Sequence, residues 1–262
     1  MSELEKCKAC RAGKGFDLAI SMAFQPIVAL SAGKVFAYEA LVRGKDGAGA
    51  GEVFSKVTDE NLYGFDQKCR QTAIEQAGML DLAQDDALLS INFLPNAVYD
   101  PKACIRLTLE TAKRTGFPLN KIMFEFTEVE RISVPHLMEI LSTYRRLGFL
   151  TAIDDFGAGF AGIDLLSKFQ PDVVKLDAGL IREIDQSSVK RTIVKHIVAM
   201  LDQLGIIVVA EGIETEDEYS CLYDMGIEHM QGWLFARPAF EALPAPKWPA
   251  DFGFDRTISR TA

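Results

Sequence analysis

The sequence alternates between short apolar runs and longer segments with helical periodicity, and this alternation limits the folds open to it. Eight runs have the pattern of buried strands, and most are followed by a helical segment. Strands that alternate with helices pair in parallel through right-handed crossovers. Eight such units in 262 residues predict an α/β fold, a (β/α)8 barrel, with a doubly wound open sheet as the alternative. The predicted strands cover residues 22–27, 35–43, 88–92, 122–126, 150–154, 173–176 and 206–210, and the last begins at 229.

The segments between these strands carry the signals of helix starts and ends. Pro101 suits the first turn of a helix, and Gly148 suits the residue that follows a helix. Because no shift in composition divides the chain, we expect one domain over residues 21–241, between a lead-in segment, 1–20, and an irregular tail, 242–262. The predicted helices cover residues 52–83 with a break near 61–64, 101–115, 134–147, 162–168, 188–204 and 216–225.

Two adjacent carboxylates, Asp154 and Asp155, end the apolar run at 149–153, and a loop with Gly157 and Gly159 follows. In an apolar site, like charges this close raise the pKa of one carboxyl group. Such a pair is therefore solvated, paired with cations or bound to metal. Because this pair lies at the end of a predicted strand, we consider metal binding or catalysis as its function.

A polar residue stands near the carboxyl end of each predicted strand, inside or beside an apolar run. Burying a polar group without a partner is costly. In a barrel these strand ends meet on one face, where active sites lie. We therefore expect a single site built from Gln25, Glu39, Asn92, Glu125, Asp154, Asp155, Lys175, Glu211 and Gln231.

The oxygen donors in this set indicate a metal centre. Carboxylate and amide oxygens are hard ligands suited to Mg²⁺ or Mn²⁺. Five carboxylates exceed what one ion needs, so we expect two ions about 3.5–4 Å apart, an arrangement that clamps the reacting oxygens of a phosphoester. Lys175 would orient or help deprotonate the attacking water, and Arg43 would hold a phosphate oxygen. The expected ligands are Glu39, Asn92, Glu125, Asp154, Asp155 and Glu211; His136, His196 and His229 are not placed to join them.

Two structural alternatives stand beside this interpretation. Glu39 and Arg43 would form an ion pair at the barrel rim, and Lys175 and Asp177, on one side of a strand, would pair with each other. The tripeptide Asp155-Phe156-Gly157 resembles the metal-binding tripeptide of kinases, but the glycine-rich and His-Arg-Asp loops of kinases are missing from the sequence.

Charge and composition exclude several classes of partner. The 28 basic and 37 acidic residues give a net charge of −9, so the overall field does not favour duplex nucleic acid. No apolar run approaches the roughly 20 residues of a membrane-spanning helix, so we expect no membrane association. The polar N-terminus lacks a signal-peptide pattern, which predicts a cytoplasmic protein with reduced thiols. Cys7 and Cys10 form a single C-x-x-C, to which the sequence adds no second ligand pair.

The segment Glu39-Ala40-Leu41-Val42-Arg43 resembles the signature of the EAL-domain cyclic-di-GMP phosphodiesterases. The other motifs of that family follow in its order, over roughly residues 21–241. The family's fold is a TIM-like barrel whose first strand runs antiparallel to the rest, and the resemblance implies this fold here. The further matching motifs are Phe24-Gln25-Pro26-Ile27, Ile91-Asn92, Phe124-Glu125-Phe126-Thr127-Glu128, Asp154-Asp155-Phe156-Gly157, Val174-Lys175-Leu176-Asp177, Ala210-Glu211-Gly212-Ile213-Glu214-Thr215 and Gln231-Gly232-Trp233.

The resemblance implies a role for each matched residue. One metal would be bound by Glu39, Asn92, Glu125 and Asp154, and a second by Asp154, Asp155 and Glu211. Lys175 and Glu211 would handle the nucleophilic water. Arg43 and the backbone of Leu41 would hold phosphate, and Glu128 would steady the loop after Asp155. The substrate cleft would be lined by Gln25, Gln231, Asp177 and Pro238.

The implied reaction is hydrolysis of cyclic di-GMP to linear pGpG with two Mg²⁺ or Mn²⁺ ions, and the family often forms homodimers. The loop reads Ala158, Ala161 and Gly162 where the family usually has threonine and serines, which puts the positioning of Asp155 and the rate in question. A non-catalytic cyclic-di-GMP receptor is the main alternative. Another two-metal phosphoester hydrolase is the second, and the matches at Gln25, Arg43 and Gln231 argue against it.

Overall fold

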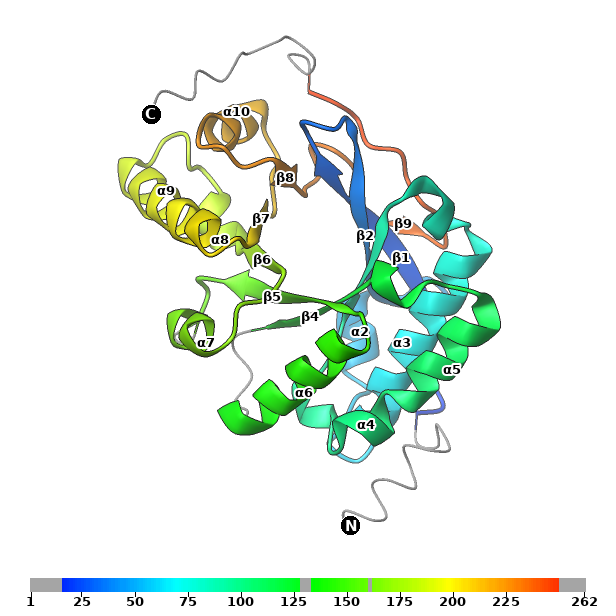
Figure 1. Ribbon diagram of the computed structural model, residues 1–262. Coiled ribbons are helices and arrows are strands. Elements are labelled where there is room, and N and C mark those ends of the chain that lie inside the picture. Colours follow the sequence, from blue (N-terminus) through cyan, green and yellow to red (C-terminus); the bar gives the residue numbers. More distant parts are fainter. Residues whose placement is uncertain (1–15, 128–132, 160–161, 250–262) are drawn as a thin grey trace.

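The computed structural model describes residues 16–127, 133–159 and 162–249 of the chain. Strands alternate with helices along it, and the strands close into a barrel with most helices on the outside (Figure 1). The strands are β1 (Ile20–Ala29), β2 (Lys34–Gly44), β3 (Leu88–Asn92), β4 (Ile122–Thr127), β5 (Leu150–Phe156), β6 (Val173–Leu176), β7 (Ile207–Ala210), β8 (His229–Met230) and β9 (Ala239–Phe240).

The barrel is closed by β1, which pairs with both β2 and β8. Both of these pairings are antiparallel, whereas every pairing from β2–β3 to β7–β8 is parallel. A tight turn joins β1 to β2, in which the backbone amide of Gly33 donates to the carbonyl of Leu30 at 3.1 Å. Because so short a connection cannot hold a crossover helix, β1 and β2 pair antiparallel. The predicted barrel and its antiparallel first strand are therefore confirmed.

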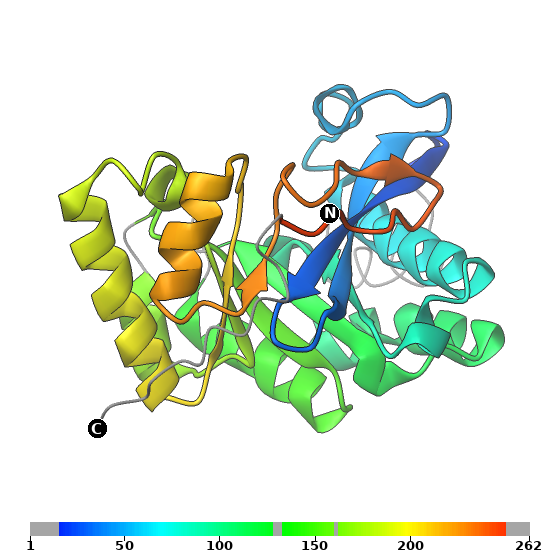
Figure 2. The ribbon, with the colours of Figure 1, turned by 90° about the horizontal axis from the view of Figure 1, so that it is seen from above.

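The ninth strand lies outside this ring. β9 pairs antiparallel with β1 at Ala23 and Phe24, and Figure 2 shows it beside the long β1–β2 ribbon. The backbone amide of Glu241 then donates to the carbonyl of Met22 at 2.9 Å. The sequence did not predict this strand, because two residues are too few to show a period.

The helices match the predicted segments with two divisions. The segment predicted at 52–83 forms α2 and α3, and its break lies at 55–61, earlier than the predicted 61–64. The segment predicted at 101–115 as one helix forms α4 and α5, with Ile105 between them. The short α8 was not predicted. The helices are α2 (Ala50–Phe54), α3 (Leu62–Met79), α4 (Pro101–Cys104), α5 (Arg106–Thr115), α6 (Val134–Arg146), α7 (Gly162–Lys168), α8 (Ala178–Ile181), α9 (Ser188–Gln203) and α10 (Glu216–Asp224), with 3-10 turns η1 (Leu82–Asp85), η2 (Pro95–Ala97) and η3 (Leu119–Lys121). No helix in the described ranges is both long and apolar enough to cross a membrane.

An apolar layer inside the barrel supports the site. Six strands each contribute one side chain to it, and none is more than 1% exposed. Because side chains alternate along a strand, the next inward-facing residue lies two positions away. Those next residues are polar, so the layer forms the floor of the site. The layer consists of Ile27, Ala37, Met123, Ala152, Val173 and Val209, and the residues two positions away are Gln25, Glu39, Glu125, Asp154, Lys175 and Glu211.

Candidate metal centre and substrate cleft

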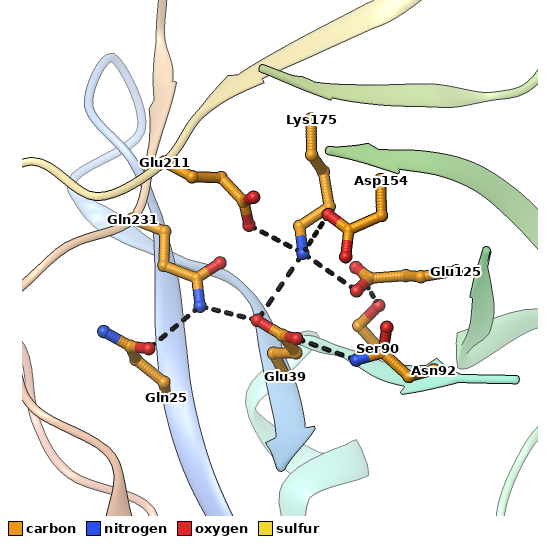
Figure 3. A network of polar contacts seen from close by, with 9 residues as sticks. All are labelled: Gln25, Glu39, Ser90, Asn92, Glu125, Asp154, Lys175, Glu211 and Gln231. Carbon is orange, nitrogen blue, oxygen red and sulfur yellow. Dashed lines mark hydrogen bonds and ion pairs between the residues drawn. The ribbon is translucent and has the colours of Figure 1, made fainter. Parts of the chain in front are cut away.

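A buried lysine lies at the centre of the polar cluster (Figure 3). Nζ of Lys175 is 2.7 Å from Oε1 of Glu211 and 2.8 Å from Oε2 of Glu125. It is 3.1 Å from Oδ1 of Asp154 and 3.5 Å from Oε2 of Glu39. Four carboxylates from different strands and strand ends therefore converge on one ammonium group, as the sequence predicted. The alternative pairing of Lys175 with Asp177 is wrong, since Asp177 instead caps α8 by accepting from the amide of Gly179 at 2.9 Å.

The carboxylates form two groups that share one residue. In each group, one oxygen from every member lies within 4.8 Å of the others. The first group is Glu39, Glu125 and Asp154, and the second is Asp154, Asp155 and Glu211. If all five are ionised, they carry four negative charges beyond the single charge of Lys175, which two divalent cations would neutralise. The donor set and its charge fit two hard metal ions.

A strand irregularity brings the adjacent Asp154 and Asp155 together on the site side. The register between β5 and β6 shifts between Ile153 and Phe156. Asp155 has φ 53°, in the left-handed region that non-glycine residues rarely adopt. Successive residues of a regular strand face opposite sides, so this bulge lets both carboxylates join one group. Ala158, a departure from the family pattern, donates its amide to the carbonyl of Asp155 at 3.0 Å.

Amide side chains orient Glu39. Nδ2 of Asn92 donates to Oε1 of Glu39 and Nε2 of Gln231 donates to Oε2, both at 2.8 Å. Nε2 of Gln231 also lies 3.2 Å from Oε1 of Gln25, and Gln25 is the partner of Glu39 in the β1–β2 register. The prediction that Gln25 and Glu39 lie at strand ends is wrong. Both lie in the middle of long strands, because the β1–β2 ribbon extends beyond the barrel face.

Burial and charge shift several pKa values in the cluster. Burial raises the pKa of Glu125 to about 8, and burial with the neighbouring charge of Asp154 raises that of Asp155 to about 6. Burial also raises the pKa of Glu211 well above its ordinary value. Burial acts to lower the pKa of Lys175, but the surrounding carboxylates outweigh it and hold that pKa well above 10.5. Lys175 is therefore protonated at neutral pH in the absence of metal.

The other predicted residues lie around this cluster. Arg43 lies four residues after Glu39 on β2, is half-buried, and donates to the carbonyl of Val42 at 2.8 Å. No ion pair joins Arg43 to Glu39 in the described part of the chain, so the structural alternative of such a pair is wrong. Pro238 directly precedes β9, and Gln25 donates to the nearby carbonyl of Ala236 at 3.0 Å. Glu128, Ala161, Cys7 and Cys10 lie outside the described residues, whereas Gly162 begins α7.

Two cavities have Asp154 and Asp155 in their walls. One, of about 380 Å³, is lined by polar groups including Gln25, Lys175, Glu211 and Gln231. The other, of about 300 Å³, is mostly apolar and includes Leu41 and Asn92. The first is also lined by three charged or aromatic side chains that the sequence analysis did not select, those of Arg182, Glu214 and Trp233. Glu214 and Trp233 belong to matched motifs, which was the available signal for them.

Ser90 is a further residue missed by the sequence analysis. Its hydroxyl donates to Oε1 of Glu125, and it is fully buried (Figure 3). A serine in a strand is common, so the available signal was its position two residues before Asn92, on the same face of β3.

The family model of the EAL domain matches residues 17–238. The chain belongs to the EAL domain family. Among solved structures, this EAL domain is similar to a standalone versatile EAL protein from Vibrio cholerae O395 in its c-di-GMP bound form. The two are 49% identical with a TM-score of 0.85, over 89% of this chain and 98% of that chain. Klebsiella pneumoniae BlrP1, in a manganese/cy-diGMP complex, is 35% identical with a TM-score of 0.83, over 88% of this chain and 59% of BlrP1.

Two curated relatives differ in what their names describe. The blue light- and temperature-regulated antirepressor BluF of Escherichia coli K12 is 34% identical over 228 residues, 87% of this chain and 56% of BluF. The cyclic di-GMP phosphodiesterase RocR of Pseudomonas aeruginosa is 36% identical over 122 residues, 46% of this chain and 31% of RocR. This EAL domain therefore spans about half the length of BluF, and its match to RocR covers about a third of that protein.

Proposed function

We propose that this EAL domain is a phosphodiesterase that hydrolyses cyclic di-GMP to linear pGpG with two divalent metal ions, Mg²⁺ or Mn²⁺. The observation that carries the proposal is the pair of carboxylate groups that share Asp154. Two groups that share one carboxylate suit a pair of ions that acts on one phosphodiester. The cyclic di-GMP named for the Vibrio cholerae and BlrP1 complexes, and the manganese of the latter, support this choice of ligand and ion.

Each ion has a defined set of candidate ligands. Glu39, Glu125 and Asp154, with Asn92 beside Glu39, would hold the first. Asp154, Asp155 and Glu211 would hold the second. When bound, two such ions supply Lewis-acid activation of water at neutral pH and offset the charge of the phosphodiester.

The chain's own residues would then manage protons and position. Glu211 belongs to the second carboxylate group, so it would lie beside the attacking water and accept its proton. Nζ of Lys175 lies 2.7 Å from Oε1 of Glu211, so Lys175 would orient that carboxylate and help to position the attacking water. Arg43 and the backbone of Leu41 would hold phosphate oxygens.

The two cavities suit a ligand with two similar halves. Both have Asp154 and Asp155 in their walls, so a phosphodiester held by these carboxylates would lie beside each cavity. Gln25, Gln231, Asp177 and Pro238 would contact the half on the polar side. The second cavity is mostly apolar, so it would accept a base by contact with apolar side chains and would not need basic ones.

A receptor that binds cyclic di-GMP without hydrolysing it is the second candidate, and the name of BluF, an antirepressor, is the observation that favours it. The decisive experiment is incubation of the purified protein with cyclic di-GMP and Mn²⁺ or Mg²⁺, followed by chromatography. We expect pGpG to appear, to stop with EDTA, and to be absent with Glu39→Ala. Tight binding with no product under any metal would replace the enzyme by the receptor. Light scattering on the same sample tests the predicted homodimer.

A further inference from the structure

We infer that Ser90 is a positioning residue of the metal centre, which acts by fixing the carboxylate of Glu125. The inference rests on the metal ligands in the proposed function. Ser90 lies on β3, a strand for which the sequence indicated Asn92 alone as a site residue. Its predicted contribution is to the affinity of one ion, and not to the chemistry of the substrate.

The register of the barrel brings Ser90 to the level of the ligands. Ser90 of β3 pairs with Glu39 of β2 and with Met123 of β4. Met123 is the inward-facing residue two positions before Glu125. The side chain of Ser90 therefore faces the barrel interior, between two proposed ligands. Both Ser90 and Glu125 are 0% exposed, so bulk water does not replace a lost hydrogen bond there.

The two oxygens of Glu125 are held from two sides. The hydroxyl of Ser90 donates to Oε1, and Nζ of Lys175 donates to Oε2 at 2.8 Å (Figure 3). With Oε1 tied to β3, the carboxylate plane is set, and Oε2 faces Lys175 and the other ligands. If a metal ion at this group displaced Lys175 from Oε2, the hydrogen bond from Ser90 to Oε1 would still hold Glu125 in this orientation.

A hydrogen bond to a metal ligand limits its rotation and typically changes metal affinity by about 10- to 100-fold when it is removed. Because Glu125 belongs to only one of the two carboxylate groups, the effect should be confined to one ion. General damage to the fold would instead weaken both. This difference separates a positioning role from a merely structural one.

The test is calorimetric titration of chelator-treated protein with Mn²⁺, without nucleotide. For Ser90→Ala we expect one of two binding sites to weaken by about 10- to 100-fold and the other to stay within about threefold. Thr151→Val is the matched control, since Thr151 is also a buried strand residue whose hydroxyl donates to a carboxylate, that of Asp172, at 2.9 Å. That pair lies outside the metal centre, so both Mn²⁺ sites should be unchanged.

A second variant keeps the test independent of folding. Ser90→Cys nearly preserves the volume but replaces a strong donor with a weak one, so its Mn²⁺ dissociation constant should fall between those of wild type and Ser90→Ala. Wild-type affinity in Ser90→Ala, or equal weakening of both sites, would overturn the role of Ser90 alone. If the unsubstituted protein binds no Mn²⁺, the metal centre and this inference both fail, whereas Mn²⁺ binding without hydrolysis affects only the proposed reaction.

Discussion

Nζ of Lys175 lies 2.7 Å from Oε1 of Glu211, and three more carboxylates surround the same ammonium group. Lys175 is therefore the resident cation that lets these carboxylates be buried together before any metal binds. Removing one partner from such a network leaves buried charge uncompensated. The predictions below test this arrangement and the local structure that supports it.

Replacing Lys175 by methionine should destabilise the metal-free protein by about 3–5 kcal/mol, because the carboxylates lose their counter-charge. Cyclic di-GMP hydrolysis should fall by about 10²- to 10⁴-fold. Urea unfolding with EDTA and then with Mn²⁺ checks the first effect, and Mn²⁺ should recover much of the loss. Lys121→Met, which removes a lysine paired with Asp86 outside the site, is the control and should keep full activity.

The stability of the metal-free protein should fall as pH rises toward 8. Burial raises the pKa of Glu125 to about 8 from an ordinary 4.5, so the native state binds more protons than the unfolded chain between these values. Stability is then lost as pH rises through that window. Burial lowers the pKa of His229, so this residue makes stability rise with pH. Its contribution ends at about pH 6.5, the ordinary pKa of histidine.

Thermal melts in EDTA at pH 7 and pH 8.5 therefore avoid the contribution of His229, and the melting temperature should be lower at pH 8.5. Cys69, whose pKa burial raises, acts in the same direction near the upper pH, so a variant of Glu125 is needed to separate the two. Saturating Mn²⁺ should remove or reverse the trend, since metal binds the deprotonated carboxylates. In Glu125→Gln the difference between the two pH values should shrink. A melting temperature in EDTA that stays the same or rises from pH 7 to pH 8.5 would show that Glu125 is not protonated in the native protein at pH 7.

A buried ion pair on α3 should contribute strongly to stability. A guanidinium nitrogen of Arg70 lies 2.8 Å from Oδ2 of Asp66, and both residues are buried. The guanidinium carbon of Arg70 is also within 5.2 Å of the ring centroids of Phe93 and Phe124. Asp66→Asn leaves Arg70 charged and unpaired, so we expect a loss of about 3–5 kcal/mol by chemical denaturation. The exposed pair of Arg114 with Glu75 is the comparison, and Arg114→Ala should cost only about 0–1 kcal/mol.

Gly157 should be needed both for stability and for the position of Asp155. It has φ +100°, and a Cβ there would lie 2.5 Å from Cδ1 of Leu180. Gly157→Ala should cost about 1–3 kcal/mol and lower hydrolysis about 10- to 100-fold by moving Asp155. Gly205→Ala is matched in backbone, with φ +70° and no atom within 4 Å of the added Cβ, and should lower stability while leaving turnover unchanged.

Much of the barrel was predictable because strands and helices carry their periods locally. The strands at 88–92 and 173–176 and the helix at 162–168 agree with the structure at both ends. Their boundaries coincide with changes in apolar pattern or with glycine and proline. Residues 101–115 were predicted to form one helix, but they form two that are divided at Ile105. No residue pattern in this segment indicates the division.

The sequence by itself determined the order of the elements and indicated the candidate ligand residues, because apolar periodicity and the motifs are properties of neighbouring residues. Only the tertiary structure decided which side chains meet. The pairing of Gln25 with Glu39, the left-handed Asp155 and the bond from Ser90 to Glu125 all depend on strand register. Register is set by barrel closure, which joins residues far apart in the chain, so its consequences cannot be read from local sequence.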